Sequence, residues 1–140
     1  MKNEIESVID KSKRSIKSAK REYKAGDYDY ACSRAYYAAF YLLEGVLLLD
    51  NKRFTKHSAV ISFFNKDYVK TNVFPVEFSK HIKYLLKRRE IGDYSFSIRV
   101  SQEEAQNCIS KAEEIIKVIS DYLKKKSTEA HEIEEPETRD

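Results

Sequence analysis

The chain has 140 residues, of which 35% are charged, and it contains only three glycines, two prolines and two cysteines. This composition is typical of a single helical domain with solvated outer faces. It excludes a membrane-spanning helix, because no apolar run approaches the roughly 18 uncharged residues that a bilayer requires. Met1 to Glu4 are charged and lack the apolar segment of a signal peptide, so we expect a cytoplasmic protein.

The net charge of +3 is unevenly distributed along the chain. Residues 127–140 contain six acidic residues and one arginine, a charge of −5, so the preceding 126 residues carry +8. A basic body is consistent with a nucleotide or nucleic-acid partner, and the alternative is that lysine-rich helices only keep the protein in solution. Because residues 127–140 lack apolar periodicity, we expect them to form a disordered acidic tail after a helical domain at residues 1–126.

The first half of the chain predicts three helices. Apolar residues at helical spacing begin at Ile5, and Gly26-Asp27 provides a stop and a new start. The second helix, about residues 28–50, is the central one, since small residues that let a neighbour approach recur along one of its faces: Ala31, Ala35, Ala38 and Ala39. A shorter helix begins near residue 55, and residues 66–75 are expected to form a loop.

The second half predicts two further helices. One covers about residues 75–90 and is followed by a break or irregular turn at Gly92 and an extended connection. The last begins with a capping box at Ser101 to Glu104 and continues until its apolar period ends near Lys126. The predicted class is all-α, an up-and-down four-helix bundle with an additional short helix.

The segment Lys87 to Tyr94 is the best candidate site. Adjacent arginines point in different directions on a helix, so one can face inward, and the planar guanidinium binds phosphate through a fork of donors. We expect Asp93 to hold Arg88, with Gly92 turning the backbone so that the two converge. The structural alternative is an Arg–Asp pair that only ties the helix end to the next loop.

Other residues have weaker signals. Arg34 and Tyr37 on the central helix are expected to face the same groove, and His57 joins them if its helix lies against the helix of Arg88. Cys32 and Cys108 lack the spacing of metal ligands and are expected to be buried thiols. No motif for a metal or a cofactor is present, so neither is expected.

Three pieces of this sequence together resemble the HEPN domain (higher eukaryotes and prokaryotes nucleotide-binding) over roughly residues 5 to 125. They are Arg34-Ala35-Tyr36-Tyr37-Ala38, Lys56-His57-Ser58, and Arg88 through Asp93-Tyr94. More narrowly, the chain is similar to small prokaryotic HEPN proteins encoded beside a minimal nucleotidyltransferase. The resemblance implies a homodimer whose grooves meet at the interface, and a toxin–antitoxin-like pairing with such a nucleotidyltransferase.

The resemblance also implies roles for single residues. In ribonuclease-active HEPN proteins an arginine is followed after four to six residues by a histidine; here Arg88 takes the arginine position and Asp93 stands where the histidine is expected. An aspartate, with an ordinary pKa of about 3.9, poorly protonates a leaving oxygen near pH 7. The main hypothesis is therefore binding of a nucleotide or RNA phosphate. The alternatives are a metal-independent ribonuclease that uses Arg88 with Asp93 or with His57, whose imidazole would replace the missing one, and a non-catalytic dimeric scaffold whose basic groove only docks its partner. The candidate catalytic residues are Arg88 and Asp93, and the candidate ligand-binding residues are Arg34, Tyr37, His57, Arg88, Arg89 and Tyr94, with Arg88 expected to matter more than Arg89.

Overall fold

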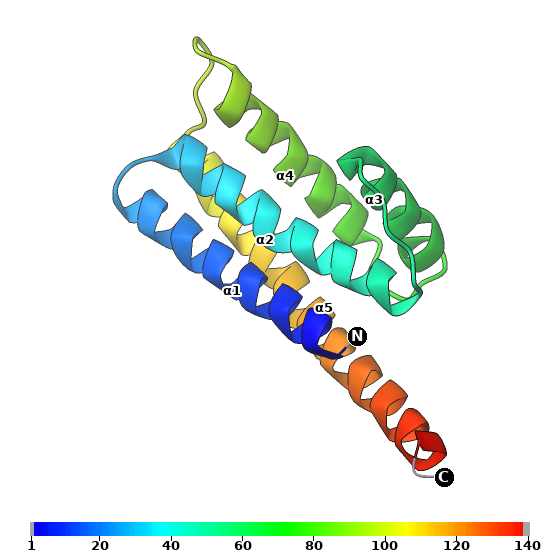
Figure 1. Ribbon diagram of the computed structural model, residues 1–140. Helices are drawn as coiled ribbons and strands as arrows, with labels where there is room; N and C mark the ends of the chain where they lie inside the picture. The colour runs from blue at the N-terminus through cyan, green and yellow to red at the C-terminus, as the bar shows by residue number, and fades with distance from the viewer. Residues whose placement is uncertain (1, 139–140) are drawn as a thin grey trace.

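The computed structural model describes the backbone of residues 2–138 and the side chains of residues 4–129. Within this range the chain forms five α-helices, one π-helical turn and no strand. The elements are α1 (Lys2–Lys24), α2 (Tyr28–Leu49), α3 (His57–Phe64), the π-helical turn η1 (Asn65–Val69), α4 (Glu77–Tyr94) and α5 (Gln102–Thr138). Helices α1, α2, α4 and α5 make the up-and-down bundle and α3 lies beside it (Figure 1), which confirms the predicted class.

Helix α2 is the centre of the bundle and packs against each of the other four α-helices. Its small residues are buried as predicted: Ala31, Ala35 and Ala38 are completely inaccessible to solvent. They bring α1 close enough for the Ser12 hydroxyl to donate a hydrogen bond to the Ala38 carbonyl at 2.6 Å. Cys32 and Cys108 are both buried free thiols in this core, which confirms that expectation.

The helix boundaries differ from the predictions in two places near the middle of the chain. Residues 65–69 form the π-helical turn η1 where a loop was predicted. The predicted break at Gly92 is wrong, because α4 continues through it to Tyr94. A Cβ atom at position 92 would lie 3.0 Å from the backbone oxygen of Asp29, so this glycine permits close approach of α4 to the start of α2.

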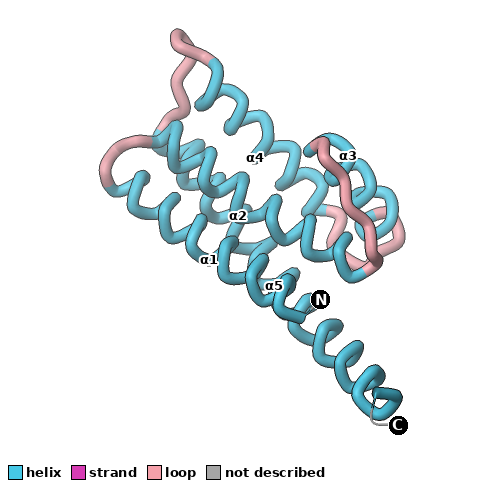
Figure 2. Tube along the Cα trace, in the orientation of Figure 1, coloured by secondary structure: helices cyan, strands magenta, loops and turns pink. Residues whose placement is uncertain are grey.

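The last helix also differs from its predicted length. It begins at the predicted capping box, where the Ser101 hydroxyl accepts from the Glu104 N–H and the Glu104 carboxylate accepts from the Ser101 N–H. It then continues past Lys126 to Thr138 and extends beyond the other helices (Figures 1 and 2), so the end expected near Lys126 is wrong. Glutamate and alanine favour helix even where no apolar face is needed. The division into a domain at 1–126 and a tail at 127–140 stays a prediction.

Candidate functional site

Arg89 lies at the centre of a cluster of aromatic side chains between α2 and α4. Its guanidinium carbon is 5.0 Å from the ring centre of Tyr36, 5.7 Å from that of Tyr37 and 5.8 Å from that of Tyr94. Its Nη1 donates to the Tyr94 hydroxyl at 3.2 Å and lies 3.5 Å from Oδ2 of Asp93. The Arg89 side chain is only 12% exposed, and its Nε is buried without a hydrogen-bond partner among the described residues. The guanidinium is thus held in place, and its Nε–H is a buried donor without a partner among the described residues.

His57, the first residue of α3, completes this cluster. Its ring stacks on Phe40 of α2 with centroids 4.0 Å apart. Its Nδ1 lies 3.1 Å from the hydroxyl oxygen of Tyr36, within hydrogen-bond distance. Tyr36 therefore lies between Arg89 on one helix and His57 on another, and it joins α4, α2 and α3 at one point. We refer to Tyr36, Tyr37, His57, Arg89 and Tyr94 as the Arg89 cluster.

The charges of the Arg89 cluster follow from burial and from the arginine. Burial raises the pKa of Tyr36 to about 12, and the positive charge of Arg89 opposes this rise. Burial, followed by the charge of Arg89, lowers the pKa of His57 below its usual value of 6.5. Burial lowers the pKa of Arg89, but Tyr37, Tyr36 and the hydrogen-bonded Tyr94 together outweigh burial, so the net shift of this pKa is upward. Near neutral pH the cluster contains one positive charge beside a neutral phenol and a neutral imidazole.

Arg88 faces a different neighbour. Its Nε lies 2.6 Å from Oε2 of Glu104 on α5, although the two atoms are not aligned as a hydrogen bond, and its guanidinium carbon lies 4.3 Å above the Tyr84 ring. The pKa of Glu104 lies below its usual value. The hydrogen bond from the Ser101 backbone N–H lowers it most, burial opposes this, and the Ser101 hydroxyl and Arg88 lower it further. Arg88 is therefore part of the contact between α4 and α5.

The expected pairing of Arg88 with Asp93 is wrong. Because α4 is helical through Gly92, residues four positions apart share a face, and Asp93 pairs with Arg89. Arg88 is five positions from Asp93 and points toward α5 instead. The prediction failed because it required the chain to fold back at Gly92.

Of the other predicted site residues, the structure brings together Tyr37, His57 and Tyr94 with Arg89. Arg34 is exposed, and among the described residues its side chain forms no ion pair; its backbone carbonyl accepts a hydrogen bond from Ser15 of α1. The sequence reasoning missed Phe40 as the residue on which His57 stacks. The signal was the four-residue spacing of Tyr36 and Phe40, whose rings stack at 5.7 Å.

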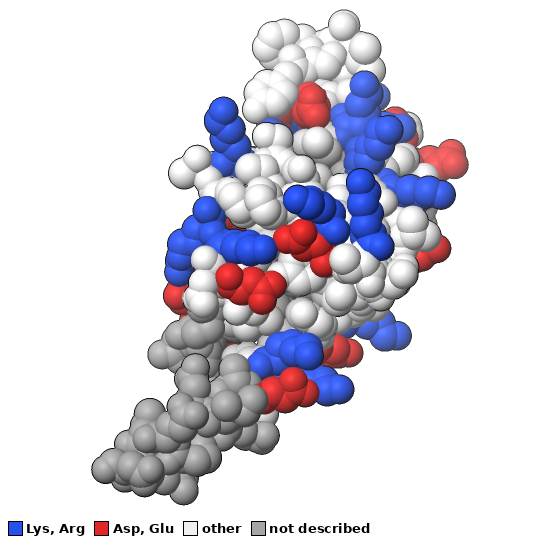
Figure 3. Space-filling view, turned by 90° about the vertical axis from the view of Figure 1, so that its right-hand side faces the viewer, with Lys and Arg blue, Asp and Glu red and all other residues white. Residues whose placement is uncertain are grey.

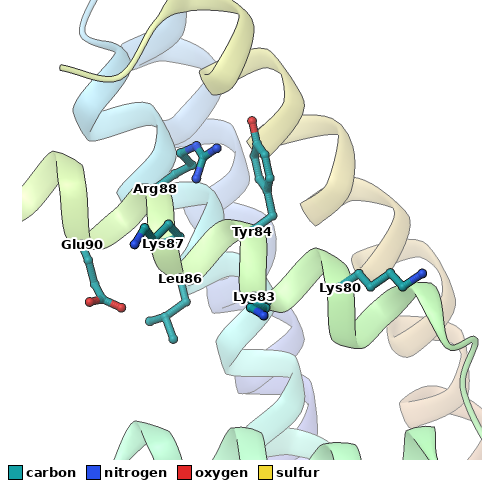
Figure 4. Close-up of a pocket in the computed structure, with 7 residues that line it drawn as sticks. All are labelled: Lys80, Lys83, Tyr84, Leu86, Lys87, Arg88 and Glu90. Atoms are coloured by element: carbon teal, nitrogen blue, oxygen red, sulfur yellow. The ribbon is translucent and has the colours of Figure 1, made fainter. Parts of the chain in front are cut away.

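A hollow of about 560 Å³ lies on the outer side of α4. Its lining includes Lys80, Lys83, Lys87 and Arg88, with Glu90 as the acidic member. In Figure 4 the side chains of Tyr84 and Arg88 point to the same side of α4. On the face of the molecule that Figure 3 presents, lysine and arginine side chains are spread over the surface and interspersed with acidic ones.

The described residues show no sign of a metal site or a membrane span. Within them, no group of three or more histidine, cysteine, aspartate or glutamate side chains is arranged to hold a metal ion. None of the helices in that range combines the length and the apolar character that a membrane span requires.

The chain is similar to curated proteins from archaea and bacteria. A Methanocaldococcus jannaschii protein named "Putative toxin MJ0142" is 33% identical over 122 residues, which cover 87% of this chain and 83% of that protein. A Thermotoga maritima protein named "UPF0332 protein" is 30% identical over 125 residues, which cover 86% of this chain and 95% of that protein.

Two solved structures share the fold. TT1696 from Thermus thermophilus superposes with a TM-score of 0.71 at 20% identity, over 86% of this chain and 98% of that one. ST0689, described as an archaeal HEPN homologue, superposes with a TM-score of 0.68 at 20% identity, over 85% of this chain and 97% of that one. The family description of the HEPN domain matches residues 5–125, a range that contains nearly all of α1, the whole of α2, α3 and α4, and the Arg89 cluster. The resemblance seen in the sequence is thereby confirmed, and the chain belongs to the HEPN domain family.

Proposed function

We propose that this HEPN protein has a toxin-like role and binds the phosphate of an RNA or nucleotide at Arg89. The toxin-like role is supported by the family and by relatives from Methanocaldococcus jannaschii whose names describe them as toxins. The observation that carries the binding proposal is the guanidinium of Arg89, which is held among three tyrosine rings with 12% of its side chain exposed. Its buried Nε has no hydrogen-bond partner among the described residues.

The chemistry of the Arg89 cluster suits a phosphate. A guanidinium offers parallel N–H donors that match two phosphate oxygens, and its low exposure strengthens their attraction. Tyr36 and His57 are neutral near pH 7, so neither cancels the positive charge. Asp93 is the one carboxylate paired with Arg89 among the described residues, and a phosphate would compete with it for Nη1.

A second candidate function is metal-independent ribonuclease activity. The observation that favours it is the position of His57, whose imidazole lies in the Arg89 cluster although it comes from a different helix. Imidazole is the side chain best suited to proton transfer near pH 7. Cleavage of RNA in the presence of a chelator, lost in His57→Gln, would support this function, and absence of cleavage by the wild type would exclude it.

We further propose a homodimer and a partner nucleotidyltransferase in a toxin–antitoxin-like pair. The names of two relatives contain the word toxin, and they support the toxin member of this pair but not the identity of its partner. Co-expression with the product of a neighbouring nucleotidyltransferase gene should relieve growth inhibition by this protein. If the neighbouring genes encode no nucleotidyltransferase, the pairing proposal fails.

Titration of a labelled single-stranded RNA against wild type, Arg89→Gln and Arg88→Gln tests the binding proposal. We expect Arg89→Gln to weaken binding about ten- to hundredfold, as expected for charge-assisted hydrogen bonds. Arg88→Gln removes the same charge from the neighbouring position and is the matched control, expected to have the smaller effect. The opposite order would restore the sequence-based expectation that Arg88 is the principal ligand.

A further inference from the structure

The exposed face of α4 carries a stripe of unpaired positive charge. Lys80, Lys83 and Lys87 are all exposed, and among the described side chains none of them takes part in an ion pair. All three line the hollow on α4 (Figure 4), in which Glu90 is the acidic residue. The stripe therefore keeps a net positive charge that no described neighbour neutralises.

The stripe leads to Tyr94. Lys80, Lys87 and Tyr94 are separated by seven residues each, and an α-helix returns to nearly the same face after seven residues, with a drift of about 20°. At 1.5 Å per residue, the path from Lys80 to Tyr94 is roughly 20 Å long. Tyr94 also accepts the hydrogen bond from Arg89, so it connects the stripe with the Arg89 cluster.

Beyond Tyr94, the loop between α4 and α5 presents apolar side chains to solvent. Phe96 is completely exposed, Tyr94 is 70% exposed and Ile98 is 62% exposed. The loop has a defined shape, because the Ser95 hydroxyl accepts a hydrogen bond from the Ile98 N–H at 3.0 Å. Its far end is tied to α2, where Oδ1 of Asp29 accepts from the Val100 N–H at 3.1 Å. In Figure 1 this loop lies past the end of α4.

We propose that an unpaired strand of RNA runs along this face, with its phosphates on Lys80, Lys83 and Lys87 and its bases stacked on Tyr94 and Phe96. The proposal rests on the phosphate site proposed at Arg89, and it names single-stranded RNA as the class of ligand for that site. Basic tracks beside exposed aromatic rings are how proteins hold unpaired strands, because every base has a face that can stack. A duplex keeps its bases inside its own stack and cannot offer them to Phe96.

Charge favours a polynucleotide over a second copy of this chain on the same surface. Two copies related by a two-fold axis at α4 would bring the lysine stripes together, and like charges in an interface are unfavourable. A polyanion is attracted by the same lysines. The length of the stripe also exceeds what one mononucleotide can cover, so affinity should rise with oligonucleotide length.

The test measures fluorescence anisotropy of a labelled dodecameric oligouridylate at several salt concentrations. Phe96→Ala should weaken binding about five- to hundredfold, the range for loss of one stacked base, and should leave the salt dependence unchanged. Val118→Ala on α5, a second exposed apolar residue, is its control and should have no effect. Binding of the corresponding RNA duplex should be unaffected by Phe96→Ala.

The contribution of the three lysines is tested separately, by the salt dependence of RNA binding. Replacing Lys80, Lys83 and Lys87 with glutamine should reduce the slope of log K against log salt by about 2, because each phosphate contact on a single strand contributes about 0.7. The control replaces Lys13, Lys17 and Lys24 on α1, which are exposed and change the net charge equally. The proposal is overturned if both triple variants change the slope equally, or if Phe96→Ala retains wild-type affinity.

Two further results distinguish this proposal from others. If Phe96→Ala turns a dimer into a monomer in light scattering while RNA affinity stays unchanged, the loop is a self-association surface and the stacking proposal is wrong. If Arg89→Gln retains wild-type affinity while the Phe96 and lysine variants lose it, the strand binds along α4 and the phosphate site at Arg89 is wrong.

Discussion

The hydroxyl oxygen of Tyr36 on α2 lies 3.1 Å from Nδ1 of His57 on α3. Tyr36 is almost completely buried, with 1% of its surface exposed, so this contact fixes the position of the α3 start against the bundle. Arg89 contacts the same phenol ring, and its guanidinium carbon is 5.0 Å from the ring centre. A single buried tyrosine thus sets the separation between an imidazole and a guanidinium.

Stability should fall at mildly acidic pH partly through His57. Burial and the charge of Arg89 lower its pKa in the folded state below the 6.5 of the unfolded chain. As pH falls, the unfolded chain therefore takes up this proton first, and the free energy of unfolding decreases from about pH 7 downward until the folded pKa is passed. Urea denaturation at pH 7 and pH 5 should show a larger decrease for wild type than for His57→Gln. An equal decrease in both proteins would contradict the shift.

Removing the Tyr36 hydroxyl should destabilise the protein. Tyr36→Phe leaves the ring in place but deletes the contact with His57, so we expect a loss of about 0.5–1.5 kcal/mol in the free energy of unfolding. Tyr37→Phe is the matched control, because no hydrogen bond of its hydroxyl is found among the described residues and its ring is half-buried. Equal losses in the two variants, measured by urea denaturation, would show that the Tyr36–His57 contact contributes nothing.

Gly92→Ala should cost more stability than Gly45→Ala. A Cβ at position 92 meets the backbone of Asp29 at 3.0 Å, which cannot move without shifting α2. A Cβ at position 45 meets only the ends of Leu123 and Val8, also at 3.0 Å, and these side chains can rotate. Alanine gains about 1 kcal/mol of helix propensity at either site. We therefore expect almost no change in the free energy of unfolding for Gly45→Ala and a net decrease of about 1 kcal/mol or more for Gly92→Ala. Thermal denaturation that ranks the two variants the other way would contradict this packing.

The proposed acidic tail should contribute little to stability. Ser127 is buried at 7% exposure, whereas the ion pair of Lys126 with Glu129 is half exposed and should contribute well under about 1 kcal/mol. Deleting residues 130–140 should therefore shift the melting temperature by less than about two degrees. Deleting residues 127–140 tests the division at 126 itself. If only the longer deletion lowers the melting temperature strongly, the domain boundary lies after Ser127.

Much of the fold can be predicted from the sequence because the packing surface of α2 is set by residues three or four positions apart. The spacing of Ala31, Ala35 and Ala38 predicts a helix that others approach closely, and all three are fully buried. The capping box at Ser101 likewise depends on residues three positions apart, and its start is predicted correctly. Local spacing is sufficient in both cases.

The candidate site was harder to predict because it depends on contacts between distant residues. Whether Arg88 or Arg89 faces the tyrosines depends on whether α4 continues past Gly92, and that depends on the backbone of Asp29 far away in the chain. A glycine can end a helix, or it can lie within a helix where another backbone approaches closely, and the sequence does not distinguish these two cases. The pairing of His57 with Tyr36 similarly requires the path of residues 50–56, which carries no periodic signal.

The central claim is that Arg89 supplies the phosphate-binding donors, and its Nε can be observed directly. Nuclear magnetic resonance of a protein labelled with ¹⁵N at arginine Nε resolves Arg88 and Arg89, with the Arg89 signal assigned by its loss in Arg89→Lys. On addition of single-stranded oligouridylate we predict that the Arg89 Nε–H resonance shifts saturably, because this buried donor has no partner of its own among the described residues and belongs to the same guanidinium whose Nη1 would bind the phosphate. An Arg89 resonance that stays fixed up to saturating RNA, while that of Arg88 moves, would contradict the account.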